Sequence, residues 1–229
     1  LVHAQYGVDM LTEEDVEAGR LAGYRILYTS DPCISAAASK DIKRWVENGG
    51  TLVASCAAGS RNEYGEPANE LADVFGIKPG ANVETQPCEY RVRGRLNGLK
   101  HMDKVETMTG SFGIAGLKAG VEIAPAGIAN GTAGSIATFV GDGKPAAVQN
   151  RAGAGTAVYI AASIGVGYIK DANFVPDDLA ERWPGPHRTF LTQFAQNAGA
   201  APIVKLSEPV VEAGLYEKEK RLALALANF

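Results

Sequence analysis

The sequence predicts a doubly wound α/β domain whose sheet is mostly parallel and carries an antiparallel β insertion. Over residues 8–75, apolar runs of strand length alternate with segments of helical spacing. Strands separated by helices pair in parallel through right-handed crossovers. From about residue 81 to residue 150, polar and apolar residues alternate, as they do in half-exposed antiparallel strands. The composition of the 229 residues, 46% apolar and 21% charged, is typical of a globular protein.

The first half of the chain predicts three strands, each followed by a helix. The strands are the apolar runs at residues 8–11, 25–29 and 51–55. The helices follow Thr12, then span residues 39–48 and 70–75. Thr12 is a typical N-cap with acidic residues in the turn behind it. Glycine follows the second and third helices, which is typical of a helix C-terminus, and Trp45 lies on the apolar face of the second.

The second half predicts a β layer before the chain returns to the buried sheet. Within the insertion, we expect strands at residues 89–93 and 121–123 and a hairpin formed by residues 135–140 and 145–149. A turn at residues 151–155 leads into a buried strand at 156–162, and a helix follows at 187–198. The tail from residue 203 has leucine at alternate positions near its end, which favours a strand, although its composition would also suit a helix.

The start of the chain does not fit a complete doubly wound sheet. In the flavodoxin-like order, the first strand lies between the second and the third. Residues 1–5 match the end of the first helix, so we expect the sheet to lack this central strand unless another segment or another chain supplies it.

Composition and charge argue against several classes of partner. The formal net charge is −4, and acidic and basic residues are interleaved, so no basic stripe favours nucleic acid or anionic lipid. No apolar run approaches the length of a membrane helix. The cysteines, Cys33, Cys56 and Cys88, lack CxxC spacing and do not indicate a zinc site or a disulfide scaffold. We expect no cofactor and no metal, and the compartment stays open.

The candidate reactive groups lie where the predicted strands end, since ligands and nucleophiles of open α/β sheets lie at the carboxyl ends of the strands. A thiol at Cys56, on a tight strand-to-helix turn, could be a nucleophile with His187 as its base. Glycine usually lies two residues either side of such a nucleophile, but Ala54 and Ala58 occupy those positions. An inert, buried cysteine and a structural His187 explain the same residues, so the catalytic interpretation stays the alternative.

Other residues near these strand ends admit both a functional and a structural interpretation. Cys33 and Cys56 follow neighbouring strands and could pair, although the sequence cannot show the close approach that a disulfide needs. Asp31, Glu63 and Arg61 resemble paired carboxylates with a cationic clamp, but solvated loop charges or an interface salt bridge account for them as well. The Gly-Ala-Gly at residues 153–155 precedes a strand, so it predicts a hairpin turn rather than a nucleotide-binding loop.

Three segments in order give the chain a family resemblance. They are Gly-Gly-Thr-Leu-Val at 49–53 leading into Ala-Gly-Ser-Arg-Asn-Glu-Tyr-Gly at 58–65, Gly-Lys-Pro-Ala-Ala-Val at 143–148, and Gly-Thr-Ala-Val-Tyr-Ile-Ala-Ala-Ser-Ile-Gly at 155–165. In this order and spacing they resemble the class I amidotransferase-like domain that serves as the trimerisation domain of β-galactosidases. The resemblance covers residues 1–200, and residues 212–228 resemble the link from that domain into a C-terminal β-sandwich. It therefore implies one α/β domain over residues 1–200, and a linker and the start of a following β domain over residues 201–229.

The resemblance implies an amidotransferase-like fold that has lost its chemistry. Such a domain lies beside a catalytic barrel in a longer chain, contributes contacts in a homotrimer and can help to wall a neighbouring subunit's active site. We expect these contacts at the loop of Ser60, Arg61, Asn62, Glu63 and Tyr64, with Asp31 and Cys33 beside it. Three features depart from the pattern: the missing first strand, the glycine-rich stretch 110–134, and Cys56 at the elbow. A cysteine hydrolase using Cys56 and a small-ligand binding module therefore remain alternatives.

Overall fold

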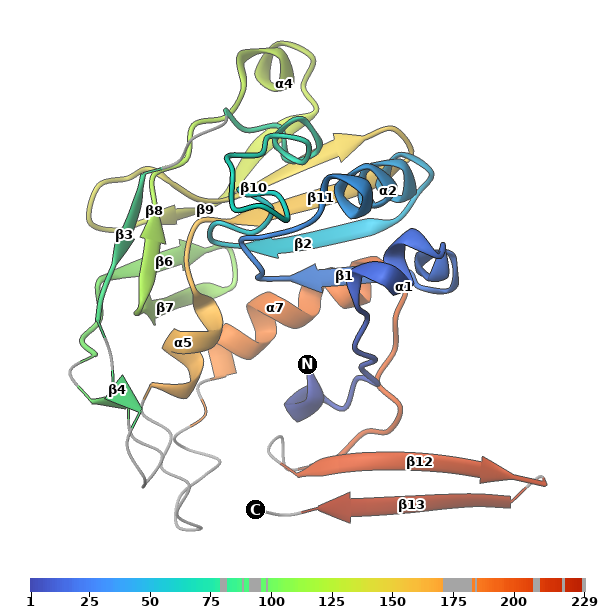
Figure 1. Ribbon diagram of the computed structural model, residues 1–229. Helices are drawn as coiled ribbons and strands as arrows, with labels where there is room; N and C mark the ends of the chain where they lie inside the picture. The colour runs from blue at the N-terminus through green and yellow to red at the C-terminus, as the bar shows by residue number, and fades with distance from the viewer. Residues whose placement is uncertain are drawn as a thin grey trace.

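The chain folds around a seven-stranded mixed sheet with helices on both faces (Figure 1). The computed structural model describes residues 1–78, 82–87, 89–90, 96–97, 99–170, 183, 185–207, 211–219 and 221–227. The strand order is β1-β2-β11-β10-β9-β6-β7. In that order the strands are β1 (Ile26–Thr29), β2 (Thr51–Ser55), β11 (Gly155–Ile160), β10 (Pro145–Ala152), β9 (Ala133–Phe139), β6 (Asp103–Thr107) and β7 (Gly110–Ile114).

One half of the sheet is parallel. β2 pairs in parallel with β1 on one side and with β11 on the other. Leu52 and Ala54 of β2 are fully buried, because a parallel strand in this position has helices over both faces. The strands predicted at residues 25–29, 51–55 and 156–162 are confirmed within a few residues.

The other half of the sheet is antiparallel. β11 pairs with β10, β10 with β9, β9 with β6 and β6 with β7, all antiparallel. The predicted β insertion therefore continues the main sheet, and the description of the sheet as mostly parallel fits only β1, β2 and β11. The predicted hairpin is confirmed as β9 and β10, and Gly153, at φ 62°, lies in the turn predicted between β10 and β11.

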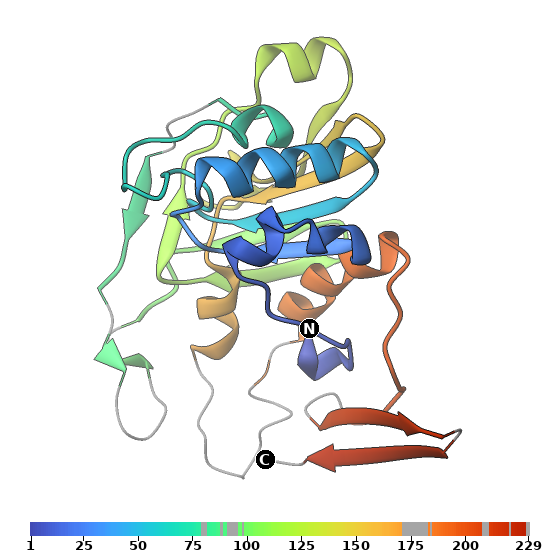
Figure 2. The same cartoon turned by 45° about the vertical axis from the view of Figure 1, so that its right-hand side comes forward.

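Two layers of helices cover the sheet (Figures 1 and 2). One layer contains α2 (Ala36–Glu47), α3 (Ala72–Phe75) and α4 (Pro125–Ala129). The opposite layer contains α5 (Ile164–Ile169) and α7 (Gly185–Asn197), which pack on β7. The core between the layers includes Val46 of α2 and Phe190 of α7, both at most 1% exposed.

The helix starts follow their caps. Thr12 caps α1 (Glu13–Glu17) with a full capping box, in which its hydroxyl accepts from the Asp15 amide and the Asp15 carboxylate accepts from the Thr12 amide. α2 begins three residues earlier than the predicted start at residue 39, because the Ser35 hydroxyl accepts from the Ala38 amide and caps the helix there. The helix predicted at 187–198 is confirmed as α7, and α3 is shorter than predicted.

Two predicted strands are wrong. Residues 8–11 are irregular and pair with no described strand, so this short apolar run is not itself a strand in the structure. Residues 121–123 contribute only the bridge of Ile123 to Ile77. Of the strand predicted at 89–93, residues 89–90 form β4 (Glu89–Tyr90), and residues 91–93 lie outside the described residues.

Smaller β elements complete the chain. β3 (Val83–Thr85) pairs with β8 (Leu117–Ala119), and β4 pairs with β5 (Leu96–Asn97). The C-terminal hairpin consists of β12 (Glu212–Lys218) and β13 (Arg221–Ala227), and it lies apart from the main sheet (Figure 1). The strand that alternating leucines predicted in the tail is therefore confirmed as β13.

Candidate functional site

The first candidate site is a hollow of about 500 Å³ at the carboxyl end of β2, called here the strand-end crevice. The turn after β2, the start of α3 and Tyr159 of β11 line it, together with Leu117 and Lys78. In open α/β sheets, ligands and nucleophiles lie at this end of the parallel strands. The residues that follow β2 therefore decide what chemistry this crevice can perform.

The tight turn after β2 is centred on Ala57. Ala57 has φ 68°, a left-handed conformation that costs a residue with a Cβ about 1 kcal/mol or more. Its amide donates to the Tyr159 hydroxyl over 3.0 Å, which ties the turn to β11. The sequence placed the elbow at Cys56, whereas the strained position is one residue later and has only a methyl side chain.

Cys56 is oriented into the core. Its side chain is 3% exposed and belongs to the main apolar cluster. Burial raises the pKa of the Cys56 thiol to about 11, so almost no thiolate forms near neutral pH. Burial likewise raises the pKa of the neighbouring Tyr159 to about 12. These values are opposite to what an activated nucleophile needs.

His187 has structural contacts of its own. It lies in the first turn of α7, is 4% exposed, and its Nε2 is 2.8 Å from the Gly113 carbonyl oxygen. A carbonyl only accepts, so Nε2 carries the hydrogen and Nδ1 is unprotonated. The ring also packs on Phe112 and Tyr168. Among the described residues, no hydrogen bond joins Cys56 to a histidine, and the structure does not bring the Cys56–His187 pair together.

The loop of residues 60–66 is held by its own polar groups. The Asn62 carboxamide oxygen accepts from the amides of Tyr64 and Glu66, and its nitrogen donates to the Glu66 carboxylate. The Arg61 guanidinium donates to the Gly65 carbonyl over 2.6 Å. The Ser60 carbonyl accepts from the Ala68 amide. Tyr64 at the tip is 80% exposed, so the loop presents an aromatic side chain on a fixed backbone.

The charged residues beside this loop fix backbone rather than face one another. The Asp31 carboxylate accepts from the Cys33 amide, and the Glu63 carboxylate accepts from the Ala36 amide at the start of α2. Hydrogen bonds from backbone amides, its own and that of Ala36, lower the pKa of Glu63. Within the part of the chain that is described, Asp31, Glu63 and Arg61 form no ion pair with one another, so the structure shows no clamped carboxylate pair there.

Cys33 and Cys56 are both free thiols. Cys33 is exposed and pairs with Arg61 in an isolated parallel bridge, whereas Cys56 is buried. The disulfide considered from the sequence is therefore absent, because the two side chains have different environments. Cys88 lies outside the described residues.

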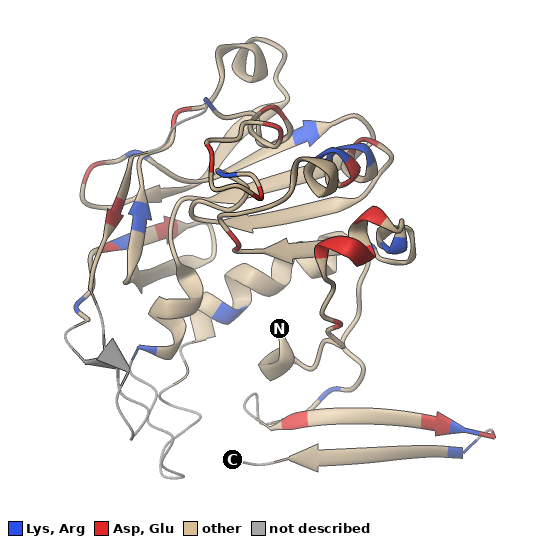
Figure 3. Cartoon of the chain, in the orientation of Figure 1, with Lys and Arg blue, Asp and Glu red and all other residues tan. Residues whose placement is uncertain are grey.

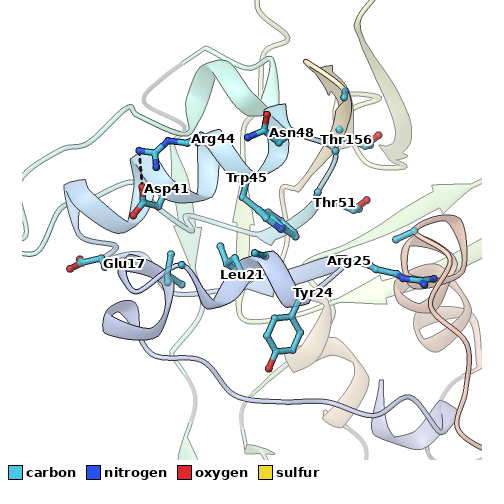
Figure 4. Close-up of a pocket in the computed structure, with 18 of the residues that line it drawn as sticks. Glu17, Leu21, Tyr24, Arg25, Asp41, Arg44, Trp45, Asn48, Thr51 and Thr156 are labelled. Carbon is cyan, nitrogen blue, oxygen red and sulfur yellow. Dashed lines mark ion pairs between the residues drawn. The ribbon is translucent and has the colours of Figure 1, made fainter.

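A second hollow, of about 770 Å³, lies at the opposite end of the parallel strands (Figure 4). Trp45 and Tyr24 line it, with the side chains of Asn48, Thr51 and Thr156. Asp41 and Arg44 form an ion pair at its rim over 2.9 Å. Trp45 is thus half-buried at a cleft, where the sequence predicted ordinary core, and its ring packs on the backbone of Gly50.

Some features of the site had no signal in the sequence. The left-handed Ala57 has a side chain that normally avoids this conformation, so only its position after a strand could have suggested it. Tyr159 looked like one residue of a buried strand, yet its hydroxyl holds the turn. Asn62 in a polar loop did carry a signal, because asparagine commonly bonds nearby backbone in turns.

Charged side chains are scattered over the molecule, with a cluster of acidic residues on α1 (Figure 3). No group of histidine, cysteine and carboxylate side chains among the described residues is arranged to hold a metal ion. No helix in the described part of the chain is long and apolar enough to cross a bilayer.

Comparison with known proteins connects this geometry to a family. The chain is similar in fold to a catalytic mutant of Gan42B, a GH42 β-galactosidase from G. stearothermophilus, with a TM-score of 0.71, 18% identity and coverage of 99% of this chain and 29% of that chain. The β-galactosidase from Bacillus circulans sp. alkalophilus gives a TM-score of 0.67 and 18% identity, with coverage of 100% of this chain and 30% of that chain. The β-galactosidase from Rahnella sp. R3 gives a TM-score of 0.63 and 19% identity, with coverage of 94% of this chain and 28% of that chain.

The chain thus spans less than a third of the length of these proteins. No curated protein matches it in sequence. The family model for the β-galactosidase trimerisation domain matches residues 4–173, which is most of the chain. The resemblance to the β-galactosidase trimerisation domain that the sequence motifs indicated is confirmed: the chain belongs to the β-galactosidase trimerisation domain family.

Proposed function

We propose that this chain is a non-catalytic assembly domain of a larger glycoside hydrolase of the β-galactosidase type, and that it contributes the contacts that hold a homotrimer together. The family match over residues 4–173 carries this proposal. The class I amidotransferase-like origin of the fold belongs to the same proposal, and the elbow-like turn at Ala57 supports it.

The crevice supports an assembly role over catalysis. A cysteine hydrolase needs a thiolate with a base in hydrogen-bonding reach. Cys56 instead has a raised pKa inside the core, and His187 donates to a backbone carbonyl. A glycosidase needs two carboxyl groups across a substrate cleft, and Asp31 and Glu63 are each bound to backbone amides.

The loop of residues 60–66 is the subunit contact in this proposal. Its backbone is fixed by Asn62 and Arg61, so little conformational entropy is lost when a partner binds. Tyr64 projects into solvent, and tyrosine is one of the residues most enriched at interface hot spots. Cys33 lies beside this loop and would lie at its edge in the contact.

The tail belongs to the same assembly proposal. Leu215, Leu222, Leu224 and Leu226 share one face of the β12–β13 hairpin, and each is at least 44% exposed. A two-stranded hairpin with an uncovered apolar face is marginal alone. Residues 201–229 would therefore be the linker and first strands of a following β domain, whose remaining strands would cover this face.

A charge at the loop tip tests the assembly proposal. Tyr64→Lys changes a side chain that is 80% exposed, so the fold should survive, while association should weaken by at least about tenfold if Tyr64 is a contact. Met108→Lys is the matched control, because Met108 is fully exposed at the β6–β7 turn, away from the loop. Sedimentation velocity of the three proteins gives the association constants. Equal association of the Tyr64 variant and the wild type would contradict a contact at this loop.

A further inference from the structure

The outer edge of β1 is open to another strand. β1 pairs with β2 and with no other described strand. The Thr51 amide donates to the Arg25 carbonyl over 3.1 Å, which orients residues 25, 27 and 29 toward β2. In a parallel ladder, alternate residues point their N–H and C=O groups to opposite sides. The main-chain groups of Ile26 and Tyr28 therefore point outward, and a β-strand is the structure that satisfies such a row.

Residues 6–11 lie opposite this edge, across a hollow. The hollow has a volume of about 520 Å³, and residues 6–11 line one side of it and residues 24–28 the other. The Tyr24 hydroxyl donates to the Asp9 carboxylate over 3.0 Å, so the tyrosine side chain spans the gap between the two segments. Figure 1 shows the segment between the N-terminal turn and α1, on the outer side of β1. We call this space the β1 slot.

The slot is covered from both faces by apolar residues. Leu21 lines it from the side of α1, and Ala195 and Ala200 line it from the side of α7. Paired strands lie about 4.8 Å apart and carry side chains toward both faces. A strand in the slot would therefore meet an apolar layer above and below, as the central strand of a parallel sheet does.

A buried hydroxyl at the slot has no hydrogen-bond partner within the described part of the chain, and two apolar side chains of residues 6–11 are exposed. The Tyr6 side chain lines the slot and is 6% exposed, and its buried hydroxyl has no hydrogen-bond partner among the described residues. Val8 and Met10 of the same segment are 45% and 90% exposed. A buried hydroxyl without a partner costs about 1–3 kcal/mol, so an occupant with main-chain acceptors and apolar side chains would satisfy both kinds of group.

We propose that the β1 slot binds an extended, apolar β-strand of the parent polypeptide, from outside these 229 residues, which adds to the sheet beside β1. This inference rests on the proposed function only in that it requires a longer parent chain. The related β-galactosidases have that length, since this chain spans 29% of one and 30% of another. The strand would convert β1 from an edge into an interior strand and would turn residues 6–11 into its second neighbour.

A synthetic strand tests the slot in the 229-residue chain. The probe is the peptide Lys-Lys-Val-Ile-Val-Ala-Val-Lys-Lys, whose apolar centre matches the two covered faces. Its control has the same sequence with every amide of the apolar centre N-methylated, which removes the donors of both edges and blocks both edges sterically. Amide exchange by NMR should slow by at least about tenfold at Ile26 and Tyr28 with the first peptide and not with the control.

A protein variant locates the binding edge. Ile26→Pro removes an outward N–H, and proline is tolerated on edge strands, so the variant should keep the β1–β2 bonds and lose the peptide effect. If the variant does not fold, the N-methylated peptide still decides the question.

Three results would overturn the proposal. The first is that the unmodified peptide does not slow amide exchange. The second is slow exchange at Ile26 and Tyr28 in the free chain, which would mean that residues 6–11 close onto β1. The third is slowing that depends on protein concentration alone, which would identify a second copy as the occupant. None of them bears on the Tyr64 contact.

Discussion

Ala57 shows how a single backbone conformation defines the turn after β2. The residue is an alanine at φ 68°, and its amide is fixed by the Tyr159 hydroxyl. A left-handed residue with a Cβ is strained, and such strain persists only where the surroundings over-determine it. The strained residue has only a methyl side chain and no reactive group, which agrees with a structural role for this turn.

Glycine at this position should relieve the strain. We predict that Ala57→Gly raises the free energy of unfolding by at most about 1 kcal/mol. The relief of backbone strain slightly exceeds the extra conformational entropy that glycine loses on folding. Ala58→Gly is the control, since Ala58 has no positive φ and is 5% exposed, and it should destabilise by about 1 kcal/mol. Urea unfolding measures both. A loss of more than 1 kcal/mol in Ala57→Gly would contradict the strain argument.

The two described cysteines should differ sharply in reactivity. Cys33 is exposed, whereas Cys56 is buried and its pKa is raised to about 11. We predict that a pulse of iodoacetamide at pH 8 alkylates Cys33 and leaves Cys56 at least about 100-fold slower, because the thiolate is the nucleophile. Peptide mass mapping after the pulse gives the two rates. Faster labelling at Cys56 than at Cys33 would revive the hydrolase interpretation.

The sequence located the tight turn after β2 in the right loop but assigned it to the wrong residue, Cys56 instead of Ala57. Strand-then-turn patterning predicted an elbow after residue 55, and the elbow is there. Which residue takes the left-handed conformation depends on how Tyr159 and the neighbouring chain hold the turn, and these are contacts between segments about 100 residues apart. Asp31 and Glu63 illustrate the same limit, since their acceptors are chosen by the folded backbone.

At the scale of elements, α7 is attached to the antiparallel half of the sheet through His187. The ring donates to Gly113 of β7 and packs on Phe112, and Gly167 of α5 lies close to both partners. Burial lowers the pKa of His187. The hydrogen bond to the Gly113 carbonyl raises this pKa and the nearby His101 lowers it, both less strongly than burial. The neutral ring is therefore the form that the folded state prefers.

This preference predicts a loss of stability in acid. Because the pKa of His187 is lower in the folded state than its ordinary value of about 6.5, the unfolded chain binds a proton first as the pH falls. The contribution of His187 is complete above pH 6.5 and decreases below it. His187→Gln should cost about 1 kcal/mol at pH 8, where the amide replaces the donor, and should reduce the fall in unfolding free energy between pH 7 and pH 5.

His3 also has a pKa lowered mainly by burial, with Glu212 opposing the shift, so some pH dependence remains in every variant. Urea unfolding at four pH values gives the slopes. An unchanged slope in His187→Gln would show that His187 is not the group that titrates.

Local sequence patterns predicted most helices and strands correctly, and the wrong strand predictions arose where the outcome depends on tertiary contacts. The hairpin of β9 and β10 and the helix α7 have strong local signals, and the structure contains both. Residues 8–11 have the composition of a strand, but a strand needs a hydrogen-bonded partner, and no described strand pairs with them. The strand predicted at residues 121–123, within the β insertion, is wrong for the same reason, since only Ile123 forms a bridge, to Ile77.

At the scale of the molecule, the fold combines a parallel half with a crevice at its strand ends and an antiparallel half that extends the sheet. Three exposed features lie at its margins: the Tyr64 loop, the open edge of β1 in the parallel half, and the leucine face of the hairpin. These surfaces fit a domain that is stabilised by neighbours. The family could be read from ordered motifs in the sequence, whereas the surfaces could be located only once the fold was known.

The mass of the native protein tests the central claim most directly. One chain has a mass of 24.0 kDa. We predict that native mass spectrometry at micromolar concentration shows a species of three times this mass that dissociates to single chains on denaturation. A stable species of 24.0 kDa at every concentration tested would contradict an assembly role for this domain.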